Sequence, residues 1–122
     1  MAAVARVVDQ AASNSANGAV IDTEHLARMT LGELSLQREV LALFDRQADM
    51  LLPRIRDGAP ATAAASAHTL KGSAVGIGAF KVARAVEQVE RAGDAEITAA
   101  VDTLAAMLEE AKSEIARLLQ AG

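Results

Sequence analysis

Residues 97–118, ITAAVDTLAAMLEEAKSEIARL, carry the most regular apolar pattern in the chain. Apolar side chains recur there at alternating steps of four and three residues, at Ile97, Val101, Leu104, Leu108, Ala111, Ile115 and Leu118. Steps of this kind place the side chains on one face of an α-helix. Such a stripe suits packing against neighbouring helices at crossing angles of about 20°. The stretch therefore predicts the last helix of a helical bundle.

A long helix is predicted earlier in the chain, with Ser35 as its N-cap and Gly58 at its end, because serine and glycine favour those positions. Its apolar residues again recur at steps of three and four, at Leu36, Val40, Leu43, Phe44, Ala48, Leu51 and Ile55. We expect this whole stripe to face the core.

Two more helices are predicted between these. One begins at Pro60, a residue that suits the first turn of a helix, and extends to about residue 77. The other covers about residues 79–92, with one apolar face made of Val82, Ala85, Val86 and Val89. Gly93 and Asp94 are expected to end it and to cap the final helix.

The N-terminal part is predicted to contain only short elements. Residues 1–12 could form a short helix, and residues 13–18 have the composition of a loop. Asp22 is the expected N-cap of a short helix, with Glu24 in its first turn and its end near Gly32. The predicted fold is thus all-α: an antiparallel up-down four-helix bundle at residues 22–122, with an N-terminal extension, residues 1–21, and a short helical segment across one end.

Composition excludes several classes of protein. The chain has 122 residues, no cysteine and a formal charge of −4, so one domain without disulfides or thiolate metal sites is expected. With two phenylalanines and no tyrosine or tryptophan, nucleic-acid binding is not expected. No apolar run approaches a membrane span, and the first residues do not resemble a signal peptide. We expect a cytoplasmic monomer.

Residues 67–78, AHTLKGSAVGIG, contain the candidate functional residue, His68. At about 100° per residue, the core face of this helix is predicted to contain Ala63, Ala67, Leu70, Ala74 and Ile77. The opposite face collects Ala61, Ala64, Ala65, His68, Lys71, Gly72 and Val75. We therefore expect His68 to be exposed, with Lys71 and Gly72 beside it.

Gly72 favours a functional interpretation of this face. A glycine inside a helix costs about 1 kcal/mol relative to alanine, and a merely solvated face gains nothing from it. It would let a partner's backbone approach the imidazole closely. The alternative is that His68 and Lys71 are ordinary solvated residues.

The segment 67–78, followed by a helix that ends in Val89-Glu90, resembles the histidine-containing phosphotransfer (HPt) domains of bacterial and fungal phosphorelays. Their core motif is His-x-x-Lys-Gly with a glycine ten residues past the histidine, and the likeness spans about residues 20–120. It implies that His68 accepts the phosphoryl group and Lys71 stabilises it, while Gly72 leaves room for a receiver domain. Glu90 stands where many members have a glutamine, and would orient His68 by accepting its Nδ1–H.

The likeness also implies partners: response-regulator receiver domains and a hybrid histidine kinase. No cofactor or metal is expected in the chain itself, and Mg²⁺ would come from the receiver. The acidic pairs Asp45/Asp49 and Glu109/Glu110 are interpreted as solvated helix faces, and His25 as incidental. The competing hypothesis is a non-catalytic helical bundle that binds a receiver or another partner through the His68 face, with Ala64, Ala65 and Val75 in the docking surface.

Overall fold

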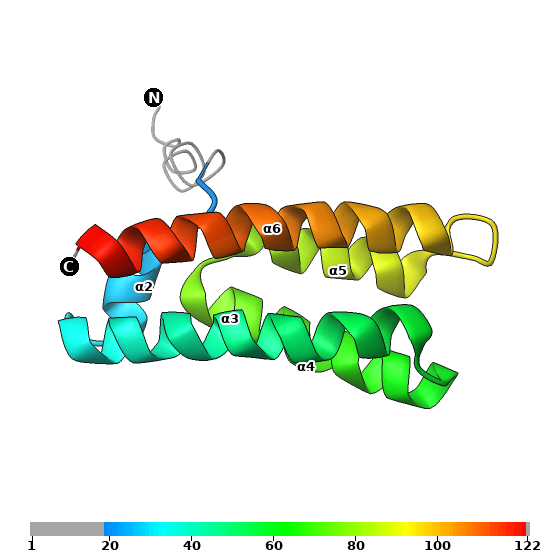
Figure 1. Ribbon diagram of the computed structural model, residues 1–122, viewed down its shortest axis with the longest axis horizontal. Helices are drawn as coiled ribbons and strands as arrows, with labels where there is room; N and C mark the ends of the chain where they lie inside the picture. The colour runs from blue at the N-terminus through cyan, green and yellow to red at the C-terminus, as the bar shows by residue number, and fades with distance from the viewer. Residues whose placement is uncertain (1–18, 122) are drawn as a thin grey trace, which may run out of the picture.

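The computed structural model describes residues 19–121. Its helices are α2 (Thr23–Met29), α3 (Leu34–Asp57), α4 (Pro60–Ile77), α5 (Phe80–Arg91) and α6 (Ile97–Ala121). Helices α3 to α6 run alternately in opposite directions, and α2 lies at one end of them (Figure 1). Each of these four packs against the next, and α6 closes the bundle against α3. The predicted all-α up-down bundle is confirmed; the helix and loop predicted for residues 1–18 lie outside the described residues.

The core lies between the four long helices. The side chains that are almost completely buried include Phe44, Leu70, Leu104, Leu108, Ile115, Val82 and Val86. The stripe predicted for α6 is buried from Val101 to Ile115, and its outer members Ile97 and Leu118 pack partly against the core. Ile21, which the domain division assigned to the N-terminal extension, also belongs to the core at 4% exposure.

The predicted stripe of α3 is only partly buried. Leu41, Phe44, Ala48, Leu51 and Ile55 face the core. Leu36 and Leu43, which were predicted to join them, are 36% and 47% exposed. The helix α3 contacts α4 and α6, and Leu36 and Leu43 lie outside the core on the side of α3 that lines a groove beside α2 and α4. The expectation that the whole stripe is buried was therefore wrong for Leu36 and Leu43.

Two of the three predicted N-caps are also wrong. Asp22 does cap α2, since its Oδ1 accepts the backbone N–H of His25 at 3.1 Å. Ser35 instead lies inside α3. The N-cap is Glu33, whose backbone carbonyl accepts the first hydrogen bond of the helix. Asp94 lies in a turn before α6, and Glu96 takes the expected role: its backbone carbonyl accepts from the N–H of residue 100 at 3.0 Å.

Helix α2 is attached to the C-terminal end of α4, near the predicted site. His25 Nε2 lies 2.9 Å from the carbonyl oxygen of Val75 and donates a hydrogen bond to it. The His25 ring also meets the ring of Phe80 edge to face, with centroids 5.1 Å apart. The interpretation of His25 as incidental was wrong, because its imidazole joins α2 to α4 and α5. The hydrogen bond and the ring contact together place α2 beside the C-terminal end of α4 and the start of α5.

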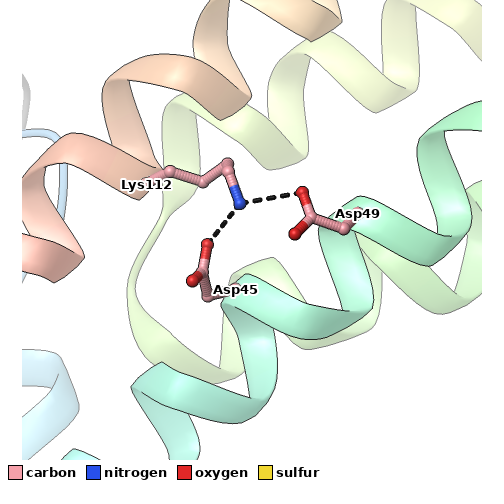
Figure 2. Close-up of polar contacts among 3 residues, drawn as sticks. All are labelled: Asp45, Asp49 and Lys112. Atoms are coloured by element: carbon pink, nitrogen blue, oxygen red, sulfur yellow. Dashed lines mark hydrogen bonds and ion pairs between the residues drawn. The ribbon is translucent and has the colours of Figure 1, made fainter.

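Lys112 of α6 links the first and the last of the four long helices, α3 and α6. Figure 2 shows its ammonium between Asp45 and Asp49, one turn apart on α3. Lys112 Nζ donates hydrogen bonds to both carboxylates, at 2.8 Å to Asp49. Burial acts to lower the pKa of Lys112, but these hydrogen bonds and the two negative charges outweigh it and raise the pKa above its ordinary value. The acidic pair is thus part of an interhelical ion pair rather than a purely solvated face.

Glu110, the second acid of the other pair, behaves in the same way. Its carboxylate lies 2.9 Å from Lys81 Nζ and so links α6 to α5. Glu109 beside it is exposed and takes part in no ion pair with the described residues. The solvated interpretation therefore applies to Glu109 and not to Glu110.

Candidate functional site

His68 lies on the exposed side of α4, as the helical wheel predicts. The core-facing residues Ala67 and Leu70 are 2% and 0% exposed, whereas His68, between them in the sequence, is exposed. One turn before His68 on its own face, Ala64 and Ala65 are exposed as well. Methyl groups do not reach across the helix surface, so the ring is open to an approaching partner.

Lys71 is next to His68 on the helix surface, three residues further along α4. Its ammonium does not point freely into solvent. Nζ lies 3.1 Å from Oε2 of Glu87 and 3.8 Å from Oε1 of Glu90, both on α5. The three side chains are each about one-third exposed. The candidate site is therefore built by α4 and α5 together, with the imidazole and the lysine on one helix and two acids on the other.

Glu90 has a different partner from the one expected. Within residues 19–121 no hydrogen bond joins its carboxylate to the His68 ring, and its ion pair is with Lys71. Glu87, the closer partner of Lys71, was missed by the sequence analysis. The signal was present, because Glu87 and Glu90 are three residues apart and so share a face of α5, but nothing in the sequence showed that this face meets Lys71.

The surface beyond His68 is formed by small residues. A Cβ built on Gly72 or on Gly76 would meet no atom within 4 Å. Neither glycine is thus required by packing inside the bundle. Val75, between them, is 40% exposed. Gly72, Val75 and Gly76 thus form a shallow strip along α4 in which the backbone is within reach of another molecule.

An apolar groove of about 290 Å³ adjoins this strip. It runs between α2, α3 and α4 and is lined by Met29, Thr30, Leu36, Val40, Leu43, Phe44, Gln47, Ser73, Gly76 and Ile77. Leu36 and Leu43, the two residues missing from the core, form part of its wall. Met29, also in the wall, is 58% exposed. The groove supplies apolar area for a partner one helical turn away from Gly72.

The described residues contain no cluster of three or more potential metal ligands. No group of three or more histidine and acidic side chains converges anywhere between residues 19 and 121. The chemistry available at His68 is that of one nucleophilic nitrogen with a cation at its side. A group of this kind can accept and release an electrophile whose remaining machinery comes from another molecule.

The comparison with protein families decides the class. The family model described as "Hpt domain" matches residues 39–120, most of the chain and nearly all of α3 to α6. The chain belongs to the Hpt domain family. No curated protein and no solved structure matches it. Hpt domains act in histidine phosphotransfer in two-component phosphorelays, where they interact with receiver domains and histidine kinases.

Membership of the Hpt family agrees with the all-helical bundle. The match begins at residue 39 and therefore leaves out α2 and the first turn of α3. These segments carry Met29 and Leu36, so part of the groove lies outside the matched region. None of the helices between residues 19 and 121 is long and apolar enough to cross a membrane.

Proposed function

We propose that this Hpt protein carries a phosphoryl group on His68 between the aspartates of receiver domains. The observation that supports it most strongly is the isolated, exposed imidazole on a face that also holds Lys71 and the open strip at Gly72. His68 is the nucleophile in this proposal, and Lys71 offsets charge on the phosphoryl group. The chain itself needs no nucleotide site.

The proposed transfer needs no reagent beyond the two proteins and the receiver's metal ion. An unprotonated ring nitrogen of His68 forms an N–P bond while the P–O bond of the aspartyl phosphate breaks, and the aspartate leaves as a carboxylate. The proton on the second ring nitrogen is not passed to the partner. The reverse step loads the aspartate of the next receiver. Mg²⁺ and the reacting aspartate belong to the receiver.

The groove and the strip are the proposed docking surface. A receiver seated on the groove, with Ala64, Ala65 and Val75 at the contact, would reach the imidazole across Gly72 without meeting a side chain. Receivers, including that of a hybrid histidine kinase, are the proposed partners of a cytoplasmic monomer. The second candidate function, a binding module without turnover, uses the same groove and differs only in not needing the imidazole.

The test is phosphotransfer from labelled receiver domains of the source organism. The wild-type chain should acquire an acid-labile, alkali-stable label, and His68→Gln should acquire none. His25→Gln is the matched control, because the chain contains just these two histidines. Labelling of His68→Gln at the wild-type level would contradict the assignment. If wild type and His68→Gln bind a receiver with equal affinity and neither becomes labelled, the result would favour the binding module.

A further inference from the structure

The ion pairs of Lys71 suggest a property of the site beyond the identity of the phosphorylated residue. Two carboxylates from α5 share one ammonium, at 3.1 Å from Glu87 and 3.8 Å from Glu90. Neither acid forms another ion pair with the residues that the structure describes. The three groups together carry a net charge of −1, and Lys71 among them is one turn from His68 on α4. A site that only had to bind an anion would be expected to carry a net positive charge and not a net charge of −1.

A phosphoryl group on His68 would bring nearly two further negative charges to the same place. Lys71 is the cation beside it, and its ammonium already has two partners. The phosphoryl oxygens must therefore compete with Glu87 and Glu90 for the same donor. The two carboxylates would also repel the negatively charged phosphoryl group directly. Because all of these groups are only partly exposed, solvent and salt screen this repulsion only in part.

We propose that Glu87 and Glu90 are positioning residues that hold Lys71 in competition with the phosphoryl group, and so keep phosphorylated His68 a ready donor. The inference rests on the proposed function, because it concerns the product of that reaction. Transfer itself is unaltered: the N–P bond breaks, the P–O bond to the acceptor aspartate forms, and His68 regains its electron pair. The two acids change how far this equilibrium favours the acceptor.

The first experiment measures that equilibrium. A receiver domain charged with labelled phosphate is incubated with equimolar wild type, Glu87→Gln, Glu90→Gln or the double variant until the distribution of label is constant. Each single variant should raise the ratio of phosphorylated carrier to phosphorylated receiver about threefold, and the double variant about tenfold. Glu109→Gln, which removes an exposed acid from α6 outside these ion pairs, should leave the ratio unchanged.

A second donor separates this inference from the proposed function. Phosphoramidate can phosphorylate an exposed histidine directly, with loss of ammonia and no receiver present. The double variant should become labelled on His68 several-fold faster than wild type, because an anionic donor meets less negative charge. Labelling by phosphoramidate in this order without transfer from any receiver would overturn the proposed function alone. Labelling from both donors with no difference between variants would overturn the inference alone, and no label on His68 from either would overturn both.

A third comparison tests whether the acids act through Lys71. In a Lys71→Met background the ammonium is absent, so Glu87→Gln should change the equilibrium less than it does in the wild type. An equal change in both backgrounds would overturn the competition for Lys71. Thermal unfolding of each variant shows whether the fold is intact, and a purely structural role would alter the unfolding midpoint without altering the phosphoryl equilibrium.

Discussion

The backbone N–H of Asp22 donates a hydrogen bond of 2.9 Å to the carbonyl oxygen of Gly78, which joins the start of α2 to the end of α4. Gly78 can make this contact because its φ of 82° places it in the left-handed region. A Cβ at this position would lie 2.7 Å from the carbonyl oxygen of Asp22. The glycine is therefore fixed both by backbone conformation and by the close approach of α2.

Gly78→Ala should accordingly lower the free energy of unfolding by about 2 kcal/mol or more, the cost of a left-handed alanine plus the conflict with Asp22. Gly32→Ala is the matched control, because its φ is 76° but a Cβ there would meet nothing within 4 Å. It should lose only about 1 kcal/mol, the cost of the left-handed conformation alone. Urea unfolding of the two variants measures the difference, and equal losses would show that contact with α2 does not matter.

Much of the bundle was predictable because its apolar residues follow the helical period closely. The stripes of α5 and α6 and the orientation of α4 follow from residue spacing alone, so His68 could be placed on the exposed face. The caps of α3 and α6 were not predictable in the same way. The turn before each helix determines at which residue the helix begins. At α6 the backbone carbonyl of Glu96 therefore takes the role expected of Asp94.

The partner of Lys71 and the groove depend on how separate helices meet. Leu43 has the spacing of a core residue but lies at the edge of the face that α3 presents to its neighbours, so it lines a groove instead. Glu87 is unremarkable in sequence and becomes part of the site only because α5 packs beside α4. Relationships of this kind are tertiary, and periodicity within one helix carries no information about them.

Gly72 gives a prediction in which stability and function change in opposite directions. Gly72→Ala should raise the free energy of unfolding by about 1 kcal/mol, because alanine favours the helix and the space around a Cβ is open. Gly72→Gln should fold equally well but lose most phosphotransfer from a receiver, since its side chain would cover the approach to His68. Urea unfolding and the receiver assay measure the two effects. Full transfer by Gly72→Gln would mean that partners do not approach across this residue.

The groove predicts a separation between docking and folding. Leu43→Ser should weaken receiver binding about tenfold, as loss of an apolar contact within an interface often does, while changing the free energy of unfolding little. The matched control is Met50→Ser on the same helix, since Met50 is 48% exposed and does not line the groove. Titration of a receiver domain against both variants provides the comparison. Equal affinities would place the docking surface elsewhere.

Lys112 predicts a change in stability at alkaline pH. Its pKa is raised in the folded protein by Asp45 and Asp49, which outweigh the opposing effect of burial. A raised folded-state pKa stabilises the fold fully below the unfolded-state value, the ordinary 10.5, and this contribution is lost as pH rises through the folded-state value. Lys112→Met should therefore be less stable than wild type by about 1 kcal/mol at neutral pH, and the difference should narrow above pH 10.5.

The control for Lys112→Met is Arg56→Met, which removes the ion pair between Arg56 and Asp102. Both side chains of that pair are well exposed, at 39% and 62%, so its loss should cost less than about 0.5 kcal/mol. The difference in cost arises because Lys112 is more buried, at 24% exposure, and bridges two carboxylates on α3. Urea unfolding of the three proteins between pH 7 and pH 11.5 provides the measurement. A stability difference between wild type and Lys112→Met that stays constant over this range would show that the lysine contributes through packing of its alkyl chain and not through its charge.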